Sequence, residues 1–191
     1  HTIWGYYQFK LFTDILKDIE ELAPSAWFIN VANPVFELST LAHRTSKVKY
    51  IGLCHGHLGY LRSAVPVLGM RLAKERGLDI TAKCAAEHPE CFLTIQSLLD
   101  PGELEIEMVG FNHVIWLTKY KYRGEDAYKY LDKWAEEDAE TFWRAWREHT
   151  YNPFDIDLSP AAIDMYRAYG LLPIGDAVRG GTWKYHWNLK T

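Results

Sequence analysis

Residues 26–53 read AWFINVANPVFELSTLAHRTSKVKYIGL, and the fold class follows from them. The apolar run over 26–32 predicts a short strand buried on both faces, and 48–53 predicts a second strand. Between them, Pro34 suits the first turn of a helix over 35–42. Together these segments predict a β-α-β unit with parallel strands, the basic unit of an α/β fold.

The flanking segments extend this pattern in both directions. Apolar spacing predicts helices over 9–22, over 58–75 with an interruption at Pro66 and Gly77 as a C-cap, over 125–146 as one long charged helix, and over 161–169 behind the N-cap Ser159. Residues 104–122 alternate and are rich in β-branched and aromatic side chains, which predicts strands. We place a domain boundary near Ile80, giving domains over 1–79 and 80–191.

Bulk composition limits the class of protein. The 191 residues carry a net charge of -4 and are 48% hydrophobic, which is typical of a globular protein and predicts no nucleic-acid partner. No apolar run is long enough to cross a bilayer, so no membrane partner is expected. Three cysteines without a recognisable spacing indicate free thiols and a cytoplasmic setting. The start at His1, in mid-pattern, suggests a portion of a longer chain.

The segment Cys54-His55-Gly56-His57 follows a predicted parallel strand, where open α/β sheets place their ligand crevice. A thiolate and an imidazole suit a borderline-soft divalent ion, and few protein ligands leave positions open for substrate oxygens. The alternative is a buried structural cysteine beside loop histidines. His113 is a second ligand candidate, although a single histidine after a strand is more often structural.

Two further segments carry polar groups. Asn30 and Asn33 offer amides that could bind sugar hydroxyls or a nicotinamide, although Asn-Pro is also a common turn. Asp176 and Arg179 place a carboxylate and a guanidinium in a glycine-flanked segment, where the backbone could approach a ligand closely. A surface turn with a solvated ion pair is the ordinary alternative there.

Taken in order, four motifs resemble glycoside hydrolase family 4, most closely its α-galacturonidase and α-glucuronidase members. They are Asn33-Pro34-Val35-Phe36-Glu37, Cys54-His55-Gly56-His57, Gly110-Phe111-Asn112-His113 and Pro173-Ile174-Gly175-Asp176-Ala177-Val178-Arg179. The resemblance implies the C-terminal part of a Rossmann-like NAD-binding domain, followed by part of an α+β domain like that of lactate dehydrogenase. The family's glycine-rich dinucleotide turn is absent from these residues.

The resemblance also implies roles for individual residues. Cys54 and His113 would hold Mn²⁺ or another divalent ion, Asn33 and Asn112 would bind the sugar, and Asn30 and Asn33 would contact NAD. Asp176 would be the base and His55 a candidate acid. Arg179, helped by His57, would bind the carboxylate of a uronic-acid substrate.

The chemistry implied by the family is a redox-assisted elimination. Hydride leaves sugar C3 for the nicotinamide, a base removes the acidified proton from C2, and the glycosidic oxygen leaves C1. Water then adds, and the hydride returns. We therefore expect hydrolysis of α-galacturonides or α-glucuronides by a homo-oligomer, either a dimer or a tetramer, acting on a small glycoside.

Three other functions stay open from the sequence. An α-glucosidase or α-galactosidase of the same family would act on neutral sugars. An NAD-dependent hydroxy-acid dehydrogenase would need a catalytic histidine and an arginine in place of a metal site. A sugar-binding module would use the eight Trp and twelve Tyr residues without metal or NAD.

Overall fold

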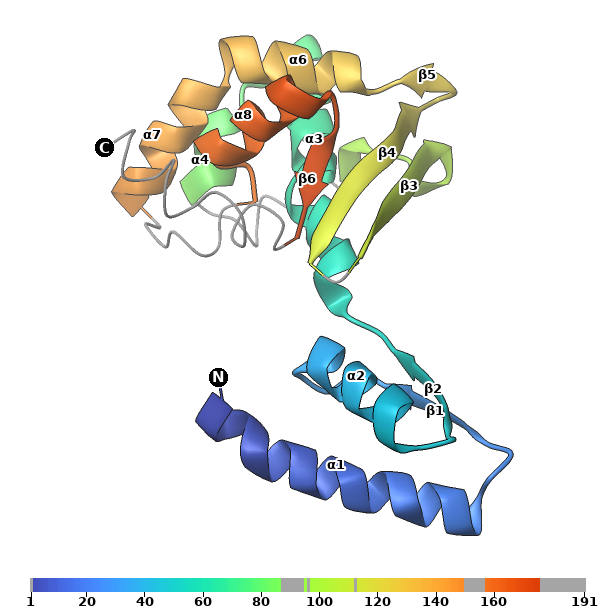
Figure 1. Cartoon of the computed structure of the whole chain (residues 1–191). Helices are drawn as coiled ribbons and strands as arrows, with labels where there is room; N and C mark the ends of the chain where they lie inside the picture. The colour runs from blue at the N-terminus through green and yellow to red at the C-terminus, as the bar shows by residue number, and fades with distance from the viewer. Residues whose placement is uncertain (1, 87–94, 96, 112, 150–156, 176–191) are drawn as a thin grey trace. The chain divides into compact units, whose positions relative to one another are not determined.

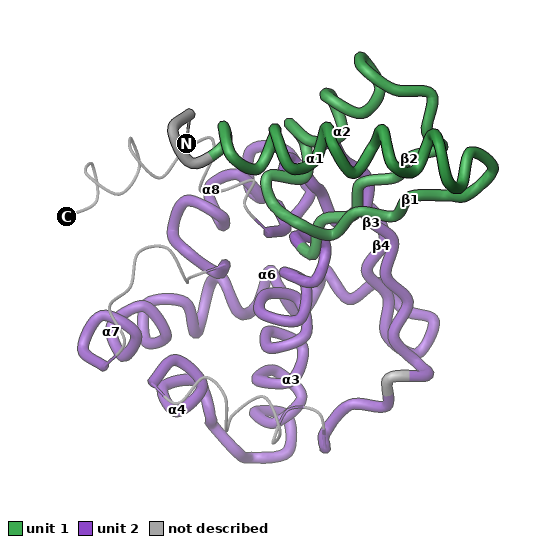
Figure 2. The backbone as a smooth tube through the Cα atoms, turned by 90° about the horizontal axis from the view of Figure 1, so that it is seen from below, with its two compact units in different colours: residues 1–55 green, residues 56–191 purple. Residues whose placement is uncertain are grey.

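The structure is a computed structural model that describes residues 2–86, 95, 97–111, 113–149 and 157–175. It divides into two compact units, unit 1 (residues 1–55) and unit 2 (residues 56–191), as coloured in Figure 2. Both helices and strands occur in each unit, which confirms the mixed α/β class (Figure 1). None of the described helices combines the length and the low polarity that crossing a bilayer would require.

Unit 1 contains the predicted β-α-β motif. Its elements are α1 (Thr2–Leu22), β1 (Trp27–Asn30), α2 (Val35–Thr45) and β2 (Lys49–Gly52). The two strands pair in parallel, from Trp27 opposite Lys49 to Asn30 opposite Gly52. The helix between them provides the crossover that parallel neighbours require.

The core of unit 1 lies on one face of this sheet. Phe12 of α1 stacks on Phe28 of β1 with ring centroids 5.4 Å apart, and both rings meet Tyr50 of β2 edge to face. Both helices gather on that face, so Trp27 and Ile29 on the other face remain 61% and 57% exposed. The prediction that this strand is buried on both faces is therefore wrong for the described residues.

Unit 2 packs helices against one face of an antiparallel sheet. Among the described residues its helices are η1 (His55–Arg62, which starts at the end of unit 1), α3 (Ala64–Glu75), α4 (Thr81–Ala86), η2 (Pro101–Glu103), α6 (Tyr128–Glu137), α7 (Ala139–His149) and α8 (Pro160–Tyr169). Its strands are β3 (Leu104–Phe111), β4 (Val114–Tyr122), β5 (Glu125–Asp126) and β6 (Leu172–Ile174). β4 pairs with the other three strands.

The helix expected over 58–75 divides into η1 and α3, and Pro66 falls in the first turn of α3, where a missing N–H leaves no helical bond unmade. Val67, Leu68 and Met70 are buried in the core of unit 2. Contacts within the chain divide it into compact units between residues 55 and 56. The assignment of 1–79 to a dinucleotide domain and 80–191 to a catalytic domain stays a prediction.

The prediction of a single long helix over 125–146 is wrong. β5 occupies the start of this segment, and the helix is interrupted at Asp138, between α6 and α7. At this break the Asp138 carboxylate, only 4% exposed, accepts hydrogen bonds from Arg71, at 2.7 Å, and from Lys74. Arg71 also contacts Glu137 at 2.7 Å. Burial lowers the pKa of Arg71, but the two carboxylates outweigh this effect, and the net shift is upward.

Other local predictions are confirmed. The Ser159 hydroxyl accepts a hydrogen bond from the Ala162 N–H and caps α8, with Pro160 in the first turn. Gly77 has a φ of +79° and follows the last turn of α3, where its N–H donates to the carbonyl of Lys74.

The Tyr128 hydroxyl connects β4 and β6. It donates to the carbonyl of Leu117 and accepts from the N–H of Leu172 at 3.2 Å. Its ring stacks on Tyr166 of α8, with centroids 5.4 Å apart. A side chain at the start of α6 thus helps to hold the short strand β6 in place.

The cysteines differ from one another. Cys54 is not part of a disulfide, whereas Cys84, in α4 and only 4% exposed, is disulfide-bonded. The expectation of free thiols is therefore wrong for Cys84. Spacing along the sequence does not report the distance between Cα atoms that decides whether a disulfide can form.

Candidate active site

Two turns of unit 2 lie at the same end of its sheet. β4 begins directly after His113, and β6 ends directly before Gly175. Ile115 pairs with Ile174 in antiparallel register, so the start of β4 lies beside the end of β6. The motif that carries His113 and the motif that begins at Pro173 are therefore neighbours in space.

The segment after Cys54-His55 joins these two turns through direct backbone contact. A Cβ atom added to Gly59 would lie 2.6 Å from the Gly175 nitrogen, and one added to Gly175 would lie 2.5 Å from the Gly56 carbonyl oxygen. Both distances are shorter than real Cβ atoms adopt, so only glycine permits this approach. Three of the four predicted motifs thus meet at one end of the sheet.

We expect Gly175→Ala to destabilise the protein more than the matched control Gly170→Ala. Both glycines have positive φ, +63° and +72°, and so share a penalty of about 1–2 kcal/mol. At position 175 the new methyl group would also meet the backbone of Gly56, which adds about 1–3 kcal/mol to the loss of stability. At position 170 nothing lies within 4 Å of the new methyl group, so this second penalty is absent. Urea denaturation measures both variants. Equal losses of stability would contradict the contact with Gly56.

The predicted metal ligands are divided between the units. Cys54, which is half-buried, and His55, which is exposed, end unit 1, whereas exposed His57 and half-buried His113 belong to unit 2. Within the described part of the chain, no group of three or more His, Cys, Asp or Glu side chains could hold a metal ion. The pairing of Cys54 with His113 stays a prediction.

The two asparagines at the end of β1 differ in their surroundings. Asn30 is 5% exposed, and its amide both donates to the Ala32 carbonyl, at 3.1 Å, and accepts from the Ala32 N–H, at 3.0 Å. These bonds shape the loop after β1 and occupy groups that were expected to contact NAD. Asn33 is exposed, and its peptide bond to Pro34 is cis.

Three predicted site residues, Asn112, Asp176 and Arg179, lie outside the described residues, so their roles stay predictions. In contrast, the structure shows a contribution that the sequence analysis missed, that of Gly59. A second glycine three positions after Gly56, in a segment already selected for its chemistry, was the available signal.

Comparison with known families assigns the chain. Residues 1–70 match the model of family 4 glycosyl hydrolases, and residues 108–191 match the model of the C-terminal domain of the same family. The chain belongs to glycosyl hydrolase family 4. The resemblance drawn from the four motifs is therefore confirmed.

Several bacterial glycosidases match this chain over two thirds or more of its length. An alpha-galactosidase of Bacillus subtilis is 32% identical over 128 residues, which cover 67% of this chain and 23% of that protein. An alpha-galacturonidase of Bacillus subtilis is 22% identical over 176 residues, covering 90% and 34% respectively. A 6-phospho-beta-glucosidase of Escherichia coli is 26% identical over 162 residues. The chain therefore spans about a quarter to a third of the length of these relatives.

A solved structure supports the fold. The crystal structure of a putative glucosidase, lplD, from Bacillus subtilis matches 88% of this chain and 34% of its own, with a TM-score of 0.56 and 22% identity. At this identity the match shows that the fold is shared and says nothing further about substrate.

Proposed function

We propose that the protein hydrolyses α-linked glycosides, with galacturonides or glucuronides as the substrate class, by removing the proton on C2 of the sugar. The observation that carries the proposal is the convergence of three motifs at one end of the sheet of unit 2, through Gly56, Gly59 and Gly175. Membership of family 4 supports the reaction class.

The donor set of this chain fits a divalent ion. Cys54 is not part of a disulfide, and His113 lies in the turn beside Gly175. The covalent chain keeps the Cα atoms of Cys54 and Gly56 within about 7 Å, and the Gly56 carbonyl lies against Gly175. A soft thiolate and an imidazole suit Mn²⁺ or Zn²⁺ with positions left open for sugar oxygens. We propose Cys54 and His113 as its protein ligands.

The fit to NAD is limited to the β-α-β unit. The loop between β1 and α2 reads Val31-Ala32-Asn33-Pro34 and contains no glycine, so it does not supply the turn that binds a pyrophosphate. We therefore assign no step to a cofactor contact in this chain. In the whole protein, bound nicotinamide would accept hydride from sugar C3, and the ion would stabilise negative charge beside C2.

The remaining roles fall to side chains of this chain. Asp176 takes the C2 proton, and the C2–H electron pair forms the C1–C2 double bond as the C1–O bond breaks. His55 gives a proton to the departing oxygen. Asn33 and Asn112 orient the sugar hydroxyls, while Arg179 and His57 bind the carboxylate.

A neutral α-galactoside is the second candidate substrate, because the relative that is 32% identical is an alpha-galactosidase. It differs from the matching galacturonide only at C6. A carboxylate there would pair with Arg179, whereas a hydroxymethyl group would leave that guanidinium without a partner.

Hydrolysis in D₂O tests the proposal. We expect deuterium at C2 of the released sugar, because the proton that Asp176 removes exchanges with solvent before water adds back. Mass spectrometry and NMR of the sugar from a matched pair, an α-galacturonide and the α-galactoside, measure the label and the rate together. Product with unlabelled C2 would overturn the proposal, and comparable rates for the pair would remove the case for a carboxylate-binding Arg179.

A further inference from the structure

Ser63 stands immediately before α3, at the position where a serine commonly caps the helix that follows it. Here its side chain makes no capping hydrogen bond to α3. The hydroxyl instead reaches back along η1 and donates to the carbonyl of Gly59 at 2.9 Å, and the residue is fully buried. A residue type suited to the start of one helix is thus used to hold the segment that precedes it.

Gly59 connects Ser63 to the motif that begins at Pro173. Its Cα lies so close to the nitrogen of Gly175 that an added Cβ would be 2.6 Å from that atom. Gly175 lies in turn against the carbonyl of Gly56. The Ser63 hydroxyl therefore fixes a buried residue of η1 that touches the backbone at the end of β6.

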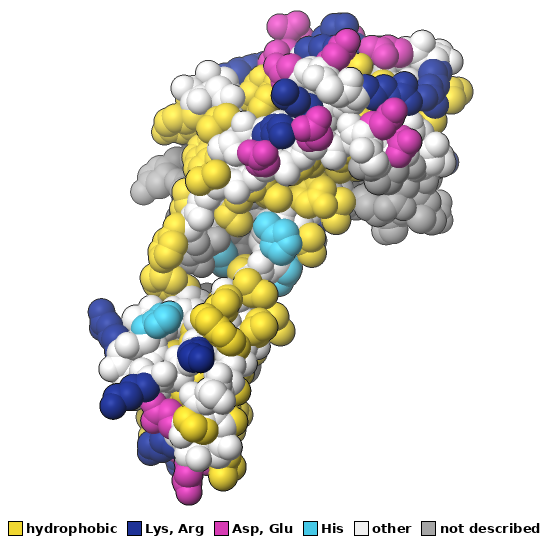
Figure 3. Space-filling model, turned by 90° about the vertical axis from the view of Figure 1, so that its right-hand side faces the viewer, with side chains coloured by type: hydrophobic (Ala, Val, Ile, Leu, Met, Phe, Trp, Pro, Cys, Tyr) yellow, Lys and Arg dark blue, Asp and Glu magenta, His cyan; other side chains and the backbone are white. Residues whose placement is uncertain are grey.

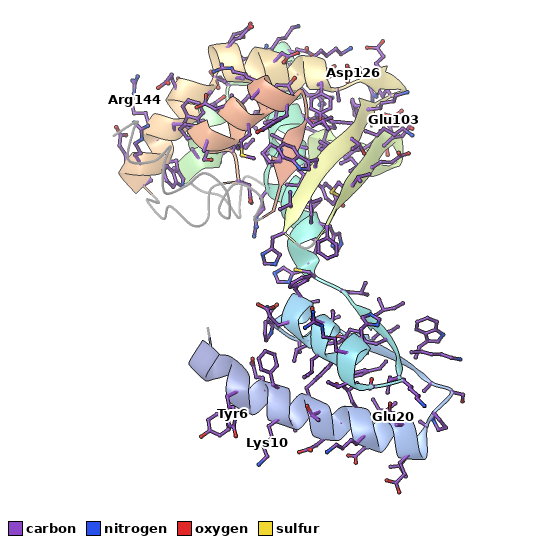
Figure 4. The ribbon with its side chains drawn as sticks, viewed as in Figure 1. Tyr6, Lys10, Glu20, Glu103, Asp126 and Arg144 are labelled. Atoms are coloured by element: carbon purple, nitrogen blue, oxygen red, sulfur yellow. The ribbon has the colours of Figure 1, made fainter. Side chains whose placement is uncertain are left out.

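The residue next to Ser63 is attached to β4. The Tyr120 hydroxyl donates to the carbonyl of Ala64 at 2.7 Å, inside the core of unit 2. Burial raises the pKa of this hydroxyl well above its ordinary value, so it keeps its proton and remains a donor. Tyr120 precedes Lys121, which pairs with Asp126, labelled in Figure 4 at the end of the sheet remote from the start of β4.

These contacts form a closed path through unit 2. Toward one end, β4 is attached to Ala64 by the Tyr120 hydroxyl, and at its start it is attached to β6 by backbone pairing. Ser63 and Gly59 complete the path between these two attachments. Each added attachment removes conformational freedom from the segment that it holds. The place of η1 beside β6 therefore depends on the Ser63 hydroxyl.

We propose that Ser63 is a positioning residue for His57, whose place relative to the end of β6 its hydroxyl fixes through Gly59. The inference rests on the proposed function, in which His57 helps to bind the carboxylate of a uronic acid. His57 lies two positions before Gly59 on η1 and is exposed, and histidine side chains reach the surface in Figure 3. Without the hydroxyl η1 shifts, and a displacement of about 1 Å at such a group lowers a rate by about 100-fold.

The ratio of kcat/KM for an α-galacturonide to kcat/KM for the matching α-galactoside tests the proposal in the whole protein. A loss of folded protein lowers both values alike, whereas a displaced His57 affects the substrate that carries a carboxylate. We expect Ser63→Ala to lower this ratio by between about 10-fold and 100-fold.

Ser159→Ala is the matched control. Ser159 is also a buried serine directly before a helix of unit 2, but its hydroxyl caps that helix, α8. Its replacement should lower the midpoint of urea denaturation, as loss of a cap does, and leave the ratio of the two substrates unchanged. An equal fall of the ratio in Ser63→Ala and Ser159→Ala would overturn the proposal.

Two further variants test the path of the effect. In a His57→Asn background, Ser63→Ala should not lower the ratio again, because the group that it positions is already gone. Tyr120→Phe removes the neighbouring attachment to Ala64 and should lower the ratio in the parent background as Ser63→Ala does. It carries the test alone if Ser63→Ala does not fold. An unchanged ratio in Tyr120→Phe and in any folded Ser63→Ala protein contradicts the proposal.

Hydrogen exchange at the amides of Gly59 and Gly175 provides a readout that needs no substrate. We expect exchange about 5-fold faster in Ser63→Ala, the effect of one lost hydrogen bond, and unchanged exchange in Ser159→Ala. Unchanged exchange in Ser63→Ala would overturn the proposal. A parent protein that does not prefer the galacturonide, or that leaves C2 unlabelled in D₂O, contradicts the proposed function instead, and hydrogen exchange then decides whether Ser63 positions η1.

Discussion

Replacing Cys54 with serine is expected to lower the rate of glycoside cleavage by more than about 100-fold at limiting Mn²⁺, since even residues that only orient metal ligands have effects of 10- to 100-fold. A serine hydroxyl stays protonated at neutral pH and is a poor ligand for a borderline-soft ion, whereas a thiol that meets the ion loses its proton. Steady-state rates across a Mn²⁺ titration measure the loss, and added Mn²⁺ should recover part of it.

A matched pair of histidine variants controls for this experiment. His113→Asn should lower the rate of cleavage as Cys54→Ser does. His43→Asn should not, because His43 is an exposed residue of α2 that packs against Tyr50 of β2. Binding of Mn²⁺ followed by electron paramagnetic resonance provides a readout independent of turnover. Full activity of the Cys54→Ser protein at limiting Mn²⁺ would remove Cys54 from the metal site.

The second large effect is expected in the ion cluster between α3 and the break before α7. Arg71→Met should destabilise the protein by about 3–5 kcal/mol, because it leaves the buried Asp138 carboxylate with Lys74 as its remaining basic contact. Chemical denaturation measures this change. By contrast, Glu137→Gln alters a carboxylate whose side chain is 49% exposed, and it should change stability by less than about 1 kcal/mol.

A double variant separates charge burial from packing. Arg71→Met combined with Asp138→Leu removes both buried charges and should recover much of the lost stability, because well-packed apolar groups commonly replace a buried ion pair without loss. If Arg71→Met alone is as stable as the parent protein, the Asp138 carboxylate does not depend on Arg71.

Local patterns predicted those parts of the fold that depend on neighbouring residues. The β-α-β unit, the strands over 104–122 and the capped start of α8 each follow from side chains within a few positions. The break at Asp138 does not, because its partner Arg71 lies 67 positions earlier and the apolar spacing continues across it from Trp134 to Phe142. Periodicity cannot report an ion pair formed with a distant helix.

The candidate site also has features that neighbouring residues predict and features that only distant contacts determine. Its motifs were found from residue type and order, but their meeting point depends on Gly59 touching Gly175, a contact between residues far apart in the chain. The use of the Asn30 amide was also missed, since a buried asparagine that closes its own loop has the same sequence context as one that binds a ligand. Only the three-dimensional structure separates the two.

The Tyr128 hydroxyl gives helix α6 influence over a strand with which it shares no backbone bond. β6 has only three residues, so one side-chain acceptor for the Leu172 amide is a substantial part of its anchorage. Fraying of the first turn of α6 would release that amide to exchange with solvent and weaken the attachment of β6. The start of α6 would thereby affect how firmly the Pro173 motif is held beside the start of β4.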